Sequence, residues 1–267
     1  MRSTGCSAEA IPAILGSLRL RPGSALPRLL ACLLLLLALP AAAVPSSLFL
    51  EELTSPELRD AVAAGHSTIL VPIGGTEQNG PHIALGKHNA RVRILAGRIA
   101  EVLGDALVAP VIAYVPEGGI DPPSAHMRYP GTLTIPRDAF EKTLESAARS
   151  LRHHGFRHVV LLGDHGGYRS SLDAVAARLN REWRGTPARV HAAPEYYGDM
   201  GHAGREDTSL ALALTPSLVR AGRLPAPSRG EGFVGDPREA SAEAGRALAD
   251  DVVRRTVAAI RKATAGR

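Results

Sequence analysis

Beyond residue 43, short apolar runs rich in β-branched residues alternate with longer segments of helical periodicity, and this alternation constrains the fold most. The runs predict strands at 67–73, 106–115, 157–162 and 190–196. The segments between them predict helices at 56–64, 89–103, 136–154 and 170–184, with a long closing helix inside 237–262. Strands that alternate with helices in this way form a mostly parallel sheet flanked by helices, so the sequence predicts an α/β fold.

The first 43 residues read as an export signal rather than as part of the folded domain. Residues 29–43 form an apolar run that arginines precede and three alanines end, and this run is too short to span a bilayer. Cleavage near Ala43 predicts a secreted or periplasmic protein with no stable membrane insertion. Residues 44–267 then form a single domain of 224 residues without Cys6 or Cys32, and therefore without disulfides.

The charge of the predicted domain argues against a nucleic-acid partner. The formal net charge falls from +5 to +2 on cleavage, because residues 1–43 carry four arginines and one glutamate. Aromatic residues make up 4% of the chain, and no basic stripe interleaved with aromatics remains. We therefore expect a small-molecule partner.

Polar side chains with catalytic or metal-binding chemistry follow three of the four predicted strands. They are Glu77, His82 and His88 after the first strand, Asp164 and His165 after the third, and Asp199 and His202 after the fourth. Because ligands bind outside the carboxyl ends of the strands in open parallel sheets, the pattern predicts a site at that edge.

Carboxylate and imidazole groups in this arrangement suit a divalent metal. Glu77 and His88 lie on a glycine-containing loop that lets both side chains turn inward, and their chemistry fits zinc, manganese or iron. His165 lies on a tight turn between glycines, which allow close approach to a ligand. One alternative remains for each histidine. His88 is a solvated loop residue, and the glycines that flank His165 serve only a backbone turn.

Two further histidines are candidates for catalysis or substrate binding. His202 lies near the start of a predicted helix and suits a neutral proton acceptor or a donor to an oxyanion, with Asp199 orienting it. The alternative is that Asp199 only caps the helix. His126 follows a loop rich in proline and glycine, and it either lines the site or only fixes that loop.

Four segments together resemble the motifs of the creatininase family, also called creatinine amidohydrolases. Residues 77–88 resemble E-Q-H-G-P-H-L-P-L-x-T-D, and residues 126–132 resemble a histidine followed by aromatic-Pro-Gly-Thr. Residues 163–167 resemble N-G-H-G-G, and residues 202–209 resemble H-A-G-E-x-E-T-S. The matches follow the family's order over about residues 47–250, and residues 235–246 resemble the family's closing segment.

This resemblance implies a three-layer α/β/α sandwich, commonly assembled into hexamers. It also implies hydrolysis of C–N bonds other than peptide bonds, in cyclic or linear amides, by metal-activated water. At matching positions, Glu77 and His165 correspond to metal ligands, and His88 corresponds to an aspartate that bridges two metals. Asp199 and His202 correspond to substrate-side or proton-transfer residues.

Departures from the motifs affect the second metal position. Asn79 stands where the motif has a metal-binding histidine, Gly167 replaces a glutamate ligand, and Arg205 replaces the first glutamate of the last motif. A single imidazole at position 88 is a poor bridge between two metals. We therefore predict one metal per chain, with the guanidinium of Arg205 acting as an anion or carbonyl clamp.

The sequence thus predicts an amidohydrolase with one divalent ion, which is zinc, manganese or iron. The predicted metal ligands are Glu77, His88, His165 and Asp207, the predicted catalytic residues are His202, Asp199 and Arg205, and the predicted substrate-binding residues are His126, Ser124 and Tyr168. Two alternatives remain: an altered family member that binds a small molecule or metal without hydrolysis, and a structural protein that keeps the fold for oligomer contacts.

Overall fold

The computed structural model describes residues 45–198, 200–227 and 232–265. The strands are β1 (Thr68–Ile73), β2 (Ala106–Val108), β3 (His158–Gly163) and β4 (Arg189–Ala192). The helices are α2 (Ser55–Ala63), α3 (Lys87–Leu103), α4 (Arg137–His153), α5 (Arg169–Glu182), α6 (Arg205–Leu214) and α7 (Ala242–Thr264). The predicted signal at 1–43 lies outside the described residues.

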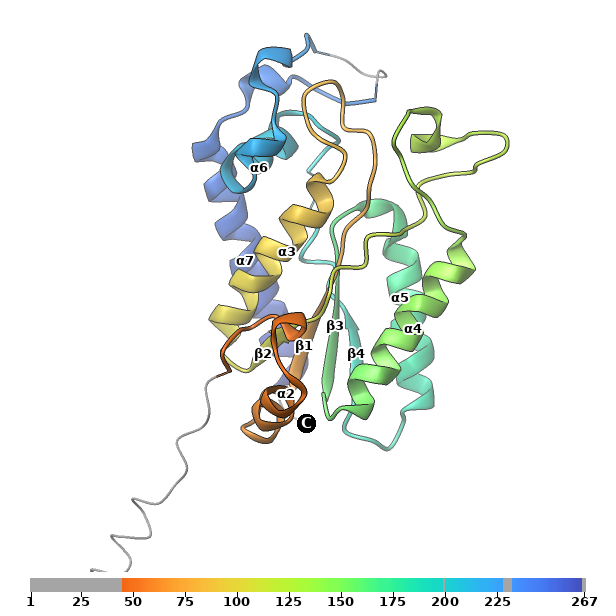
Figure 1. Ribbon diagram of the computed structural model, residues 1–267, viewed down its shortest axis with the longest axis vertical. Coiled ribbons are helices and arrows are strands. Elements are labelled where there is room, and N and C mark those ends of the chain that lie inside the picture. The colour runs from red at the N-terminus through yellow and green to blue at the C-terminus, as the bar shows by residue number, and fades with distance from the viewer. Residues whose placement is uncertain (1–44, 199, 228–231, 266–267) are drawn as a thin grey trace, which may run out of the picture. The chain divides into compact units, whose positions relative to one another are not determined.

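The four strands form a parallel sheet in the order β2-β1-β3-β4. Helices α3 and α7 cover one face and helices α4 and α5 cover the other, so the domain has three layers (Figure 1). All four strands therefore end at the same edge of the sheet, as the alternating pattern predicted. The α/β fold is confirmed.

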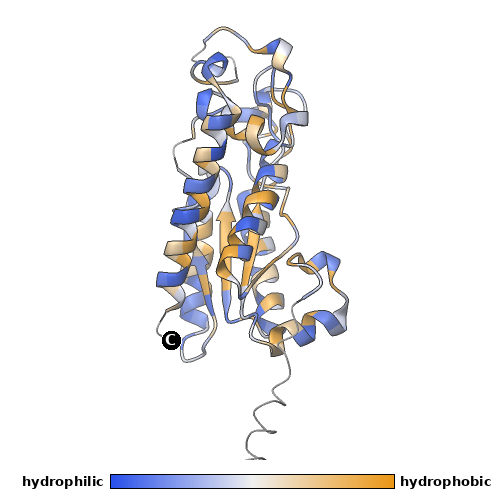
Figure 2. Ribbon diagram, turned by 90° about the vertical axis from the view of Figure 1, so that its left-hand side faces the viewer, coloured by the Kyte–Doolittle hydropathy of each residue, from blue (hydrophilic) through white to orange (hydrophobic). Residues whose placement is uncertain are grey.

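Alternate side chains of the central strands enter two separate cores. Ile69 and Val71 of β1 pack in the core with α4 and α5, whereas Leu70 packs in the core with α3 and α7. The strands are apolar throughout, while each helix is apolar mainly on the side that faces the sheet (Figure 2). Burial on both faces explains why the strand sequences read as continuous apolar runs.

Two predicted strands are shorter in the structure than the apolar runs that predicted them. The run at 106–115 forms a strand only over β2, and the run at 190–196 only over β4. Pro110 and Pro194 stand shortly after these ends, and a proline has no N–H with which to continue a ladder. Beyond Pro110 the chain returns to β1 through a single bridge between Ile112 and Ile73.

Helix α3 begins two residues earlier than the predicted helix, and this start shapes the site. Gly86 precedes its first turn, and Lys87, His88 and Arg91 are all buried there. No helix among the described residues is long and apolar enough to cross a membrane.

Candidate metal centre and active site

The loop after β1 carries Glu77, which is completely buried at the carboxyl edge of the sheet. Its backbone N–H donates to the carbonyl of Leu85 at 3.2 Å. Its own carbonyl accepts a hydrogen bond of 2.9 Å from the side-chain amide of Asn79. Asn79 therefore holds the loop in shape, and its amide nitrogen serves loop carbonyls rather than a ligand.

Four imidazoles converge on the carboxylate of Glu77. Nε2 of His88 lies 2.7 Å from Oε1, and Nδ1 of His202 lies 3.5 Å from the same oxygen. Nε2 of His126 lies 3.3 Å from Oε2, and Nε2 of His165 lies 3.8 Å from it. Residues that follow β1, β3 and β4 thus meet at one point, as their places in the sequence predicted.

Glu117, on the loop that follows β2, adds a second buried carboxyl group to this point. Potential ligand atoms of Glu77, Glu117, His126 and His165 lie within 4.8 Å of one another. Oε2 of Glu77 and Oε1 of Glu117 are buried without a hydrogen-bond partner in the described structure. Two unsatisfied buried carboxylate oxygens beside two imidazoles fit a divalent cation, because such oxygens are costly to bury unpaired.

The environment drives the pKa values of the two carboxyl groups apart. Burial would raise the pKa of Glu77, but the hydrogen bond from His88 and the charges of His88 and Lys87 outweigh it and hold this pKa below its usual range. Burial and the neighbouring charge of Glu77 raise the pKa of Glu117 to about 9. At neutral pH, Glu77 is therefore an anion and Glu117 carries a proton in the metal-free site.

His165 and His202 are neutral imidazoles in this setting. Burial is the main cause that lowers the pKa of each to about 4. The N–H of Gly167 donates to Nδ1 of His165 at 3.0 Å and fixes that ring. The amide nitrogen of Gln78 lies 2.9 Å from Nε2 of His202 and 3.2 Å from Nδ1 of His126, so this one side chain orients both rings.

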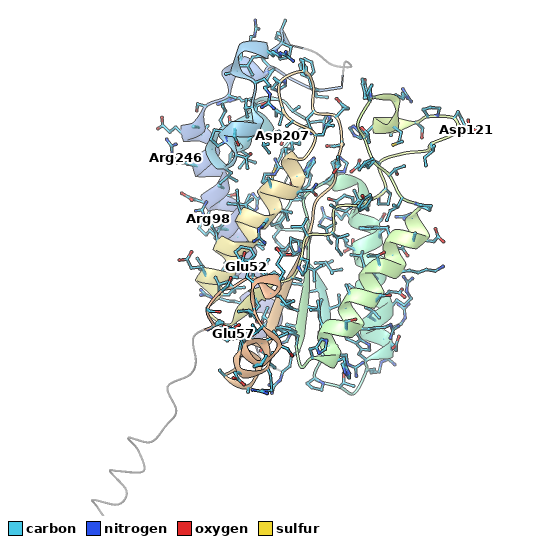
Figure 3. All side chains as sticks on the ribbon, viewed as in Figure 1. Glu52, Glu57, Arg98, Asp121, Asp207 and Arg246 are labelled. Carbon is cyan, nitrogen blue, oxygen red and sulfur yellow. The ribbon has the colours of Figure 1, made fainter. Side chains whose placement is uncertain are left out.

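A buried network of charged groups lies behind Glu77. His88 contacts Asp164 through Nδ1 at 2.7 Å, and Arg91 pairs with both Asp164 and Asp207. Lys87, 1% exposed, forms an ion pair with Asp207. Figure 3 shows Asp207 on α6 close to the first turn of α3. Both aspartates are thus fully engaged with cations inside the protein.

The structure brings some predicted metal ligands together and separates others. Glu77 and His165 lie in the cluster, as proposed from the sequence. His88 does not join it, because its ring nitrogens face Glu77 and Asp164. Asp207 does not join it either, because its oxygens accept hydrogen bonds from Lys87, Arg91 and the N–H of Ala203. In the described structure both residues support the cluster through other groups, and their assignment as metal ligands stays a prediction.

Three other predicted residues direct their polar groups away from the cluster in the described structure. Arg205 is exposed in the first turn of α6 and lines a hollow beside α7, so it is not placed as a clamp at the cluster. Ser124 is exposed, and its hydroxyl accepts a hydrogen bond from Gly119 within the loop. Tyr168 is buried, and its hydroxyl donates to the carbonyl of Gly74 at 2.6 Å, so its hydroxyl does not face a substrate. Asp199 lies outside the described residues.

Sequence reasoning missed two residues of the site. Glu117 follows an apolar run and Pro116, and two glycines come after it, but its loop carries no second ligand at a regular spacing. No sequence signal marks Lys87 as buried, and a lysine is seldom fully buried. His126, predicted to bind substrate, lies in the cluster itself.

Comparison with known proteins gives a consistent result. The family described as "Creatininase: Creatinine amidohydrolase" matches residues 51–260. The mycofactocin precursor peptide peptidase of Mycobacterium tuberculosis is 33% identical over 220 residues, covering 70% of this chain and 84% of that protein. The creatinine amidohydrolase of Pseudomonas putida is 30% identical over 201 residues, covering 67% and 76%. A mutant creatininase of the Zn-Zn type superposes with a TM-score of 0.71 and 26% identity, covering 83% of this chain and all of that one.

Proposed function

The chain belongs to the creatininase family and is a metal-dependent amidohydrolase that acts on C–N bonds, and from this premise we propose how its own residues divide the work. The single observation that carries the proposal is the pair of unsatisfied carboxylate oxygens, on Glu77 and Glu117, that face two imidazoles. We propose that Glu77, His126 and His165 hold one zinc ion. Two histidines and one glutamate form a ligand set found in catalytic zinc sites, which keep a further position open.

When bound, the metal polarises the amide carbonyl and lowers the pKa of water toward neutrality. The charge of a bound cation would favour the ionised form of Glu117, which then stands beside the ligands to take a proton from the attacking water and return it to the leaving nitrogen. A C–O bond forms, the C–N bond breaks, and the amine leaves with that proton. His202 is neutral and its Nε2 accepts from the Gln78 amide, so its N–H is on Nδ1, which faces Oε1 of Glu77 and helps to hold that carboxylate in place.

The buried network limits the site to one cation. Asp164 and Asp207, the acidic groups closest behind Glu77, are already paired with Arg91, His88 and Lys87. The Lys87 ammonium group is close enough to the cluster to lower the pKa of both His165 and His202. A second dication would meet this fixed positive charge, and among the described acidic groups of the cluster only Glu117, the proposed proton carrier, is left to offset it.

A Glu117→Gln variant tests the division of roles between the two carboxyl groups. We expect it to keep one zinc per chain while hydrolysis of an amide substrate slows by about 10²–10⁴-fold, the contribution typical of a general acid–base group. Elemental analysis measures the first quantity, and turnover on a panel of linear and cyclic amides measures the second. Loss of zinc would instead make Glu117 a ligand, and unchanged turnover would remove it from catalysis.

Export and assembly remain predictions that one preparation tests. We propose that residues 1–43 are removed, that the mature enzyme is secreted or periplasmic, and that it assembles into a homo-hexamer, because the apolar run of 29–43 and the family motifs support these expectations. N-terminal sequencing of the exported protein should start at residue 44, and light scattering should give the mass of six chains. Retention of residues 1–43 or a monomer mass would contradict the respective proposal.

A further inference from the structure

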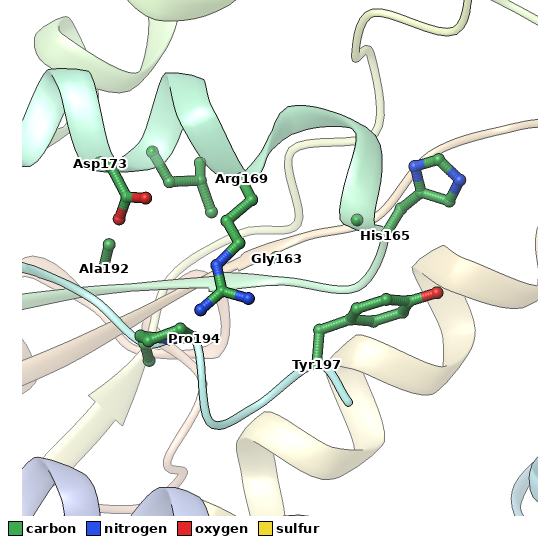
Figure 4. A pocket seen from close by; sticks show the side chains of 10 residues that line it. Gly163, His165, Arg169, Asp173, Ala192, Pro194 and Tyr197 are labelled. Carbon is green, nitrogen blue, oxygen red and sulfur yellow. The ribbon is translucent and has the colours of Figure 1, made fainter. Parts of the chain in front are cut away.

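A small hollow opens beside the cluster and shares His165 with it. The hollow lies between the start of α5 and the segment that follows β4 (Figure 4). Leu172, Ala192, Ala193 and Pro194 provide an apolar lining. Because His165 contributes both to this lining and to the cluster, a bound amide can have its carbonyl at the cluster and extend a neighbouring group into the hollow.

The guanidinium group of Arg169 gives this hollow a positive charge. Its guanidinium group points into the hollow, with His165 and Tyr197 toward one end and Asp173 and Ala192 toward the other (Figure 4). Among the described residues the side chain of Arg169 has no hydrogen bond or ion pair, although Asp173 lies one helical turn further along. Arg169 is exposed, so water solvates its guanidinium group in the free protein, and a planar carboxylate on a bound substrate is suited to replace that water.

The groups beside Arg169 favour one orientation of a carboxylate bound in the hollow. The ring of Tyr197 lies beside His165 at one end of the hollow, with the two ring centroids 6.5 Å apart. Asp173 places a negative charge toward the opposite end, which disfavours a carboxylate beyond Arg169. A carboxylate is therefore favoured at Arg169, and a small apolar side chain is favoured against the alanine and proline lining.

We infer that Arg169 is a specificity residue that binds a free carboxylate on the substrate. The substrate class is then an amide that carries a carboxylate close to the bond that is broken, such as a short peptide cleaved near its C-terminus or an N-acyl amino acid. The reaction itself rests on the proposed function, whereas the binding of the carboxylate depends only on Arg169 and the hollow.

The test compares acetyl-Ala-Ala with its C-terminal amide on the zinc-loaded protein. We expect the free acid to be hydrolysed with a KM roughly tenfold lower than that of the amide, the size of one charge-assisted hydrogen bond. Arg169→Gln should remove this difference without changing turnover at saturation. Arg181→Gln, on the exposed last turn of the same helix, is the matched control and should keep the preference.

Calorimetric binding of the same two compounds to Glu77→Gln separates this inference from the proposed function. The variant should lack metal yet still favour the free acid. A preference that Arg169→Gln abolishes, without hydrolysis by the wild type, would leave the carboxylate site standing and overturn the proposed reaction. Two results would overturn the carboxylate site alone. One is hydrolysis of both compounds with equal KM, and the other is an equal loss of binding affinity for both compounds in Arg169→Gln.

Discussion

Replacing Glu77 by glutamine should leave the protein folded but without its metal and without amide hydrolysis. The amide has nearly the shape of the carboxylate, so the loop hydrogen bonds to Leu85 and Asn79, which use backbone atoms of residue 77, can persist. The charge that the cation needs is lost, however. We expect the zinc content to fall from one per chain to near zero, and activity to fall by more than the roughly 10–100-fold that changes to outer-sphere residues cost.

The matched control is Glu101→Gln, which makes the same chemical change on an exposed position of α3. It should retain both zinc and activity. Zinc content is measured on protein that has been loaded with zinc and then desalted, and folding is checked by circular dichroism. If Glu77→Gln kept its zinc, the cluster would not be the metal centre, whatever happened to the rate.

The sequence predicted where the site lies better than which residues form it. Parallel strands end at one edge, so residues after β1, β3 and β4 had to meet there, and Glu77, His165 and His202 do. Which of two neighbouring polar residues faces the cluster depends on the start of α3, which lies two residues before the predicted start. That shift puts Lys87 and His88 on a buried helical turn rather than on a loop.

The supporting residues could not be predicted, because their roles come from contacts between distant segments. Arg91 joins Asp164 and Asp207, which lie 73 and 116 positions further along the chain, and no local pattern marks such a bridge. Arg205 differs from the family motif, but on the first turn of α6 its side chain faces solvent while Asp207 faces inward. The sequence therefore identified a change at this turn, but which residue of the turn faces inward follows only from the structure.

The buried network should make Asp207→Asn one of the most destabilising single changes in the domain. Asp207 is 1% exposed and forms ion pairs with both Lys87 and Arg91. An asparagine keeps the size but leaves Lys87 without an anion in a site that water does not reach. Removing one partner of a buried pair costs about 3–5 kcal/mol, so we expect the free energy of unfolding in urea to fall by that amount.

Asp250→Asn provides the contrast, because Asp250 pairs with Arg98 at the surface. That change should cost about 0–1 kcal/mol, as exposed ion pairs do. The double variant Lys87→Met with Asp207→Asn removes the orphaned ammonium group and should recover part of the loss. A cost below about 1 kcal/mol for Asp207→Asn would mean that the network contributes little to stability.

The same network predicts how the difference between wild type and Asp207→Asn depends on pH. Burial would raise the pKa of Asp207, but the charges of Lys87 and Arg91 outweigh it and depress this pKa far below its usual value. A depressed folded-state pKa gives stability that is present above the unfolded value of about 3.9 and is lost as the pH falls below it. Urea unfolding should therefore show the full difference at pH 7 and a shrinking one below about pH 4. A difference that stayed constant to pH 3 would show that the variant is destabilised through packing rather than through charge.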